Sequence, residues 1–321
     1  MSVIFEKLER LGLVPVIKID DPDKAVPLAK ALQDGSLPCA EITFRTKAGE
    51  ESIKRITQAL PDILVGAGTV LTQAQVDAAL AAGAQFIVSP GFNPKVVAYC
   101  LEKKVPVIPG CANPSDIEAA IEHGLSVVKF FPAEQAGGLP YIKALAGPYS
   151  GIKFVPTGGI GANNVASYIS YNRILACGGS WMVPPDALNA GDFDKITRLC
   201  REALFSMLNF SVTHFAINSA HEKEAAATAS FFASVFSLPF RETSVSFFAS
   251  DAIEVMKSPG LGAHGHIAIA TTSAKRAIAY LERQGLTINE STIRKDANGE
   301  PTFAYLSDEI AGFAVHIIQK K

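Results

Sequence analysis

One lysine lies inside an apolar segment, in the run Val127-Val128-Lys129-Phe130-Phe131-Pro132. Lysine side chains are rarely buried without a partner or a function. Burial disfavours the ammonium form and so favours the free amine, which can attack a carbonyl carbon. We therefore expect Lys129 to be a nucleophile at the end of a strand. The alternative is a side chain that extends from the strand end into solvent.

A carboxylate and a guanidinium lie four residues apart in a second segment, Glu41-Ile42-Thr43-Phe44-Arg45-Thr46. At a strand end, Glu41 could transfer protons and Arg45 could bind a substrate carboxylate. An isolated pair with this spacing is also typical of a structural ion pair, and the spacing alone does not decide between the two.

Glycines and hydroxyl residues follow several other apolar segments. Thr69 comes after Gly68, and Thr157-Gly158-Gly159 and Gly178-Gly179-Ser180 carry paired glycines whose backbone N–H groups could bind a phosphate. Ser89-Pro90-Gly91 is by itself only turn chemistry. Together these segments predict an amine, a proton shuttle, an anion clamp and a phosphate site. That combination suits carbon–carbon cleavage or formation on a phosphorylated keto acid.

Alternating strands and helices must position these groups over residues 1–208. Eight apolar segments, each followed by a loop and a helix-period stretch, predict parallel strands and a (β/α)₈ TIM barrel, in which functional groups lie at the carboxyl ends of the strands. Thr72, Asn93 and Asn113 are expected to cap linking helices. The expected strands are Leu13–Ile19, Cys39–Phe44, Ile63–Val70, Gln85–Pro90, Val105–Pro109, Ser126–Phe131, Ile152–Thr157 and Ile174–Gly178.

The composition excludes several classes of protein. A net charge of -2 does not provide the basic surface that nucleic acids or anionic membranes attract. No apolar run is long enough to span a membrane, and no export signal is visible. The five scattered cysteines indicate reduced thiols. We expect a cytoplasmic protein.

As a set, the motifs resemble the class I 2-keto-3-deoxy-6-phosphogluconate (KDPG) aldolases, including the bifunctional form that acts on 4-hydroxy-2-oxoglutarate (KHG). The resemblance covers nearly all of residues 1–208 and implies a lyase of carbohydrate metabolism in the Entner-Doudoroff pathway. Its expected products are pyruvate and glyceraldehyde 3-phosphate, or pyruvate and glyoxylate from KHG. The matching segments are 41–46, 65–70, 89–91, 129–134, 156–160 and 178–181.

The resemblance also implies roles for individual residues. Lys129 would form the Schiff base and Glu41 would shuttle protons, without a metal or an organic cofactor. The other implied contacts are Arg45, Thr69 and Thr157 at the keto-acid end, Pro90 and Phe131 in the pocket wall, and Gly158, Gly159, Gly179 and Ser180 at the phosphate. The family typically forms trimers. The segment Cys111-Ala112-Asn113-Pro114 lacks the Ser/Thr-rich loop of the family pattern, which affects the expected substrate discrimination.

Two other functions remain open at this point. A metal-free phosphosugar isomerase could use a barrel with the same phosphate site. A sensor could bind a keto acid in the barrel and use the C-terminal domain as its output.

The pattern changes near Asn209, and residues 209–321 predict a smaller α+β domain. Each half reads as a strand, a helix and three further strands, so that the domain would be a pair of βαβββ modules. The two halves are marked by a repeat of roughly 52 residues, His214-Phe215-Ala216-Ile217 against His266-Ile267-Ala268-Ile269. One expected strand of the second half is Thr292–Lys295.

This pattern resembles the vicinal oxygen chelate superfamily, which includes the glyoxalases. The resemblance places His214, Glu254, His266 and His316 at positions where such proteins hold a metal. Three histidines and one carboxylate would suit zinc, iron or manganese. A metal-free regulatory module, in which these residues only pack between strands, is the alternative, and the sequence alone assigns no metal ligand.

Overall fold

The structure is a computed structural model that describes residues 2–320. The chain divides into two compact units, Met1–Met207 and Leu208–Lys321. Among the described residues, no helix combines the length and the apolar character needed to cross a lipid bilayer.

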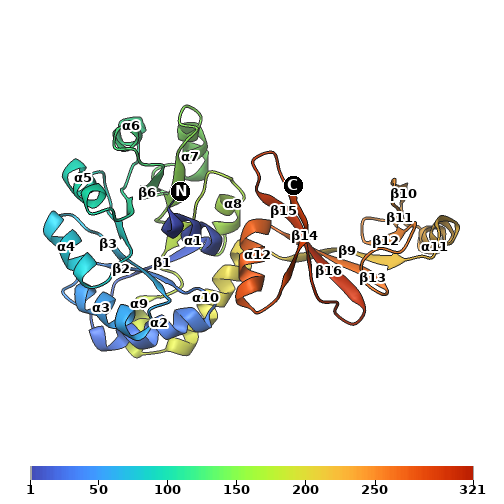
Figure 1. Cartoon of the computed structure of the whole chain (residues 1–321), viewed down its shortest axis with the longest axis horizontal. Coiled ribbons are helices and arrows are strands. Elements are labelled where there is room, and N and C mark those ends of the chain that lie inside the picture. The colour runs from blue at the N-terminus through green and yellow to red at the C-terminus, as the bar shows by residue number, and fades with distance from the viewer. Residues whose placement is uncertain (1, 321) are drawn as a thin grey trace. The chain divides into compact units, whose positions relative to one another are not determined.

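The N-terminal unit has a curled parallel sheet at its centre with helices around it (Figure 1). Its strands are β1 (Leu13–Ile17), β2 (Cys39–Thr43), β3 (Leu64–Gly68), β4 (Phe86–Val88), β5 (Val107–Ile108), β6 (Val127–Phe130), β7 (Lys153–Pro156) and β8 (Cys177–Gly179). Its helices are α1 (Val3–Leu11), α2 (Ala25–Asp34), α3 (Gly49–Ala59), α4 (Gln73–Ala81), α5 (Pro94–Glu102), α6 (Pro114–Glu122), α7 (Gly138–Ala146), α8 (Val165–Ile169), α9 (Pro185–Ala190) and α10 (Phe193–Leu208), with a 3₁₀ turn η1 (Pro22–Lys24).

The strands of this unit are buried on both faces, as expected for a parallel sheet covered by helices. Their order is β5-β4-β3-β2-β1-β8, and β6 pairs with β7 in parallel. Single parallel bridges join Gly110 to Lys129 and Thr157 to Gly178. The strands therefore present their carboxyl ends on one side of the sheet.

Local sequence accounts for three helix starts and for one short strand. The side chains of Thr72, Asn93 and Asn113 accept hydrogen bonds from the first turns of α4, α5 and α6, which confirms the three predicted caps. Strand β5 is shorter than the expected Val105–Pro109. Pro106 and Pro109 flank it and have no N–H group to donate to a neighbouring strand.

The C-terminal unit contains one eight-stranded sheet in the order β10-β11-β12-β9-β13-β16-β15-β14. Strands β9 and β13 pair antiparallel at its centre, each beginning a segment in which one helix and three strands follow (Figure 1). The elements are β9 (Ser211–Asn218), α11 (Glu222–Val235), β10 (Phe240–Glu242), β11 (Ser246–Ala249), β12 (Ile253–Met256), β13 (Gly265–Thr271), α12 (Ala274–Arg283), β14 (Ile288–Lys295), β15 (Pro301–Leu306) and β16 (Phe313–Gln319).

One face of this sheet carries the helices. Phe247 and Val255 pack against Ala225 and Ala229 of α11, and α12 packs on β15 and β16. Strand β14 begins at Ile288, earlier than the expected Thr292. It is an edge strand with several exposed residues, so apolar alternation does not mark its start.

Candidate functional site

Lys129 is held by its main chain from both sides. Its N–H donates to the carbonyl of Pro109 at 2.8 Å, and its own carbonyl accepts from Cys111 N at 2.8 Å, while β6 pairs with β7 on the other side. The residue is only 6% exposed. The side chain therefore does not extend into solvent, and the alternative interpretation of Lys129 is wrong.

Glu41 lies beside Lys129, although the two residues are far apart in the sequence. Lys129 Nζ donates to Glu41 Oε1 at 3.4 Å, and both side chains are almost fully buried. The carboxylate fills the space next to Gly68, where a Cβ would lie 2.3 Å from Oε1. The amine and the carboxylate are thus within reach of proton transfer, in a place that only a glycine on β3 leaves open.

Arg45 does not pair with Glu41 among the described residues, so the predicted alternative of a structural ion pair is wrong. Its Nε instead donates to Thr43 Oγ1 at 3.3 Å, and that hydroxyl donates to the carbonyl of Ile17 at 2.9 Å. The guanidinium is exposed beyond the end of β2. Its remaining N–H groups are available to an anion that enters the site.

Thr157 offers a buried hydroxyl to the same site. The residue is 6% exposed, and its Oγ1 has no hydrogen-bond partner among the described residues. A Cβ at Gly178 on β8 would lie 2.4 Å from this oxygen. A buried unpaired hydroxyl costs stability unless a ligand satisfies it, so Thr157 can offer a hydrogen bond to a molecule in the site.

The backbone conformation after β7 requires glycine at two successive positions. Gly158 and Gly159 have φ values of 97° and 79°, in the left-handed region that favours glycine. A Cβ at Gly159 would also lie 2.5 Å from Cγ of Glu134. Tyr168 donates a hydrogen bond to the Glu134 carboxylate, and burial, the largest cause, raises the pKa of Tyr168. This contact holds the Glu134 side chain against the glycine turn.

All the site residues predicted for the N-terminal unit line one cavity of about 310 Å³. Lys129 and Glu41 lie in its wall, and Lys129 Nζ is 5.4 Å from the centre of the Phe131 ring. The other predicted residues that line it are Arg45, Thr69, Pro90, Phe131, Thr157, Gly158, Gly159, Gly179 and Ser180.

Val16 and Ile160 also line this cavity, and sequence reasoning did not single them out. An apolar residue in an apolar strand carries no signal that separates a pocket wall from the core. The arrangement can form an imine at Lys129, move protons through Glu41 and hold anionic groups at its two ends.

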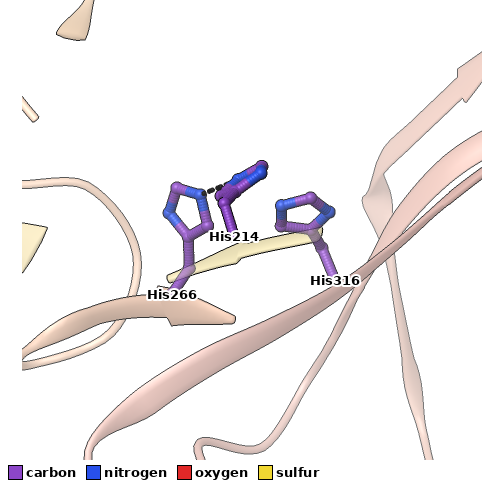
Figure 2. A group of neighbouring side chains, drawn as sticks. All are labelled: His214, His266 and His316. Carbon is purple, nitrogen blue, oxygen red and sulfur yellow. Dashed lines mark hydrogen bonds between the residues drawn. The ribbon is translucent and has the colours of Figure 1, made fainter. Parts of the chain in front are cut away.

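A second group of polar side chains lies on the C-terminal unit. His214 on β9, His266 on β13 and His316 on β16 offer ligand atoms that all lie within 4.8 Å of one another (Figure 2). Glu254 Oε2 on β12 is 3.2 Å from His214 Nε2 and 3.3 Å from His266 Nε2. We call these four residues the histidine–glutamate cluster.

Strand register explains why the histidine–glutamate cluster forms. Directly paired residues of neighbouring strands point to the same face of a sheet. Glu254 pairs with Ala216 and Ala216 with His266, while Ala268 pairs with both His214 and His316. Because Val255 packs under α11, its neighbour Glu254 faces the other way. The cluster therefore lies on the face that the helices leave open.

Hydrogen bonds orient the carboxylate of the cluster. Ser246 Oγ donates to Glu254 Oε1 at 2.5 Å, which leaves Oε2 facing the two imidazoles. Burial alone would raise the pKa of Glu254, but hydrogen bonds from His214, His266 and Ser246 hold it well below its usual range. The carboxylate is therefore ionised and available as an oxygen ligand.

His316 is the most buried histidine of the cluster. It is 3% exposed, and its Nδ1 has no hydrogen-bond partner among the described residues. Burial first, and then the neighbouring His266 and His214, lower the pKa of His316 to about 3. The ring is therefore neutral near pH 7, the form in which imidazole binds metals. Three nitrogen donors and one ionised carboxylate fit a divalent transition metal.

Comparison with known proteins supports the interpretation of the N-terminal unit. The family model of KDPG and KHG aldolase matches residues 4–199. The 2-dehydro-3-deoxy-phosphogluconate aldolase of Treponema pallidum is 55% identical over 204 residues, which cover 64% of this chain and 97% of that protein. The KHG/KDPG aldolase of Escherichia coli is 44% identical over 192 residues, 60% of this chain and 90% of its own length.

Solved structures give the same result for the fold. KDPG aldolase from Legionella pneumophila, with pyruvate captured at low pH as a covalent carbinolamine intermediate, has a TM-score of 0.61 and 36% identity, covering 63% of this chain and 98% of that one. The aldolase of Zymomonas mobilis with 3-phosphoglycerate has a TM-score of 0.58 and 40% identity, covering 62% and 94%.

Proposed function

The chain belongs to the KDPG and KHG aldolase family, and on that premise we propose that it cleaves KDPG to pyruvate and glyceraldehyde 3-phosphate at Lys129. Cleavage of KHG to pyruvate and glyoxylate at the same site is part of the proposal. The observation that carries it is the buried pair of Lys129 and Glu41, 3.4 Å apart in a cavity that the predicted anion-binding residues also line.

The reaction begins with attack of the free Lys129 amine on the C2 carbonyl. Loss of water gives an iminium ion. Glu41 takes the proton of the C4 hydroxyl, the C3–C4 bond breaks, and its electron pair moves into the iminium, which becomes an enamine as the aldehyde forms. Glu41 returns a proton to C3, and water then hydrolyses the second iminium to release pyruvate. The iminium serves as the electron sink, so we propose that the reaction needs no metal or organic cofactor.

The remaining residues bind the two ends of the substrate. Arg45, Thr69 and Thr157 would hold the carboxylate next to C2. The Thr157 hydroxyl, which has no hydrogen-bond partner in the described part of the chain, would donate to it. Pro90 and Phe131 would line the pocket between the ends. The phosphate would meet the backbone N–H groups after β7 and β8, at Gly158, Gly159, Gly179 and Ser180.

Schiff-base trapping tests this proposal. Borohydride reduction in the presence of pyruvate should attach one pyruvate-derived group to Lys129, and Lys129→Ala should lose both the adduct and pyruvate release. An isomerase or a keto-acid sensor would release no pyruvate in a coupled dehydrogenase assay. The names of the relatives favour the aldolase over both alternatives.

We further propose that the curled sheet closes into an eight-stranded (β/α)₈ barrel, which the bridges at Gly110–Lys129 and Thr157–Gly178 support. A homotrimer, which the family resemblance implies, is the proposed assembly, and light scattering of the purified chain would test it. For the C-terminal unit, the repeated order of one strand, one helix and three strands supports paired βαβββ modules like those of the vicinal oxygen chelate superfamily.

A second function, metal binding in the C-terminal unit, is favoured by the convergence of four donors. His214, Glu254, His266 and His316 would hold a divalent ion. Such an ion, when bound, supplies Lewis-acid chemistry to an oxygen ligand. Elemental analysis should find one metal per chain, and His266→Ala should remove it. A wild-type chain that binds no divalent metal would disprove this function.

A further inference from the structure

Aromatic and cationic residues lie next to the histidine–glutamate cluster, on the face of the C-terminal sheet opposite α11 and α12. Tyr305 on β15 pairs directly with His316, and Arg294 on β14 pairs with Phe303, two residues before Tyr305. Paired residues point to the same face, as do residues two apart on one strand. These side chains therefore share the face of the cluster.

Ring contacts connect His316 of the cluster to Phe303, Tyr305 and Arg294. The Phe303 ring lies 4.5 Å from the His316 ring, and the Arg294 guanidinium lies over Phe303 at 4.5 Å. The Tyr305 ring is 4.9 Å from His316 and 5.3 Å from Phe303. The Phe303 ring thus separates the Arg294 guanidinium from His316 of the cluster. A small molecule can span this separation.

Within the described part of the chain, the Arg294 guanidinium and the Tyr305 hydroxyl have no side-chain partner that would compete with a ligand. Among the described residues, Arg294 makes no ion pair and the Tyr305 hydroxyl makes no hydrogen bond. Arg241, which lies over Phe248 at 4.1 Å on the opposite side of the cluster, differs because its guanidinium is 3.5 Å from Asp251. The two arginines have similar stacking but different charge partners.

Charge balance then indicates what this face attracts. An imidazole that binds a metal does so in its neutral form, so a divalent ion held by three imidazoles and one carboxylate would carry one net positive charge together with its ligands. Arg294 adds another. We propose that this face binds a small oxyanion-bearing molecule, a carboxylate or a phosphate, with its charged group at Arg294 and one of its oxygens at the histidine–glutamate cluster. This inference rests on the proposed metal site.

Cobalt absorption of the full-length chain tests both proposals separately. Co²⁺ added to the untagged wild-type chain should give visible d–d bands at one equivalent, and His266→Ala should lose them. Titration of the cobalt-loaded chain with oxalate, and in a separate arm with inorganic phosphate, should then change these bands. The bands respond only to anions near the ion, so binding of either anion in the barrel does not interfere.

Arg294→Gln should weaken the anion response at least about tenfold, the effect of losing one charge-assisted hydrogen bond, while the cobalt stoichiometry stays at one. Arg241→Gln is the matched control and should change it by less than about threefold, as expected for an exposed and already paired charge. A response to only one of the two anions supports the inference and identifies the preferred group.

Two results separate the failures. Absence of cobalt bands in the wild-type chain would remove the metal site and this inference with it. Cobalt bands that neither anion changes would overturn the anion site but not the metal site. An Arg294→Gln variant that responds to the anions like wild type would have the same meaning.

Discussion

Gly68→Ala tests whether the position of Glu41 matters for turnover. A Cβ at residue 68 would lie 2.3 Å from Glu41 Oε1, whereas ordinary contacts begin near 3.4 Å. The difference, 3.4 − 2.3, means that the carboxylate must move by about 1 Å. A displacement of about 1 Å at a reacting group can cost about a hundredfold in rate. We therefore expect kcat/KM for pyruvate release from KDPG to fall by about this factor.

The same variant should retain its nucleophile. Lys129 is held by main-chain hydrogen bonds to Pro109 and Cys111, which follow β5, and by the pairing of β6 with β7; none of these contacts involves residue 68. Borohydride trapping with pyruvate should therefore still label Lys129 completely, although more slowly. Overpacking could lower the free energy of unfolding by about 1–3 kcal/mol, so the assay belongs well below the melting temperature.

Gly151→Ala is a suitable control, because a Cβ there meets no atom of residues 2–320 within 4 Å. It should leave both kcat/KM and trapping unchanged. A Gly68→Ala enzyme with wild-type kcat/KM would refute the assignment of Glu41 as the proton shuttle. Loss of trapping to the same extent as turnover would show instead that residue 68 supports the whole site.

Three further outcomes are expected. Thr157→Val should raise KM about tenfold, the effect of one lost hydrogen bond of about 1.4 kcal/mol. It should not lower the melting temperature, because the hydroxyl has no hydrogen-bond partner among the residues that the structure describes; a marked loss of stability would contradict this. Gly159→Ala should raise KM for KDPG far more than for KHG. An alanine Cβ would strain the left-handed backbone at residue 159 and contact Glu134, where the phosphate is expected to bind. Equal effects on both substrates would place the phosphate elsewhere. Removal of divalent metals with a chelator should leave kcat for KDPG unchanged, and a loss restored by added metal would contradict the Schiff-base mechanism.

The site of the N-terminal unit could be predicted because its residue types are unusual for their positions. Lys129 in an apolar strand and paired glycines after β7 and β8 stand out against the local pattern. The pairing of Lys129 with Glu41 could not be predicted from periodicity, since 88 residues separate the two and only the sheet brings them together. The supporting contact of Tyr168 with Glu134 is equally non-local.

The C-terminal unit was harder to predict. The internal repeat and the histidines were visible in the sequence, but their convergence depends on strand register. A shift of one residue would turn His316 or Glu254 to the helix face. Ser246, which orients Glu254, carried no signal, because one serine in a short strand is common at exposed positions. The start of the edge strand β14 was also not predicted, because its exposed polar residues interrupt the apolar alternation.

The two-sided anchoring of the Lys129 main chain has a consequence for heat inactivation. Amide groups inside a strand exchange with solvent only when a large part of the fold opens, whereas loops open at little cost. The Lys129 amide should therefore be among the slowest of the unit to exchange, while the exposed segment around Arg45 opens earlier. On heating, substrate affinity should decline before the capacity to form the imine, which should persist until the N-terminal unit unfolds as a whole.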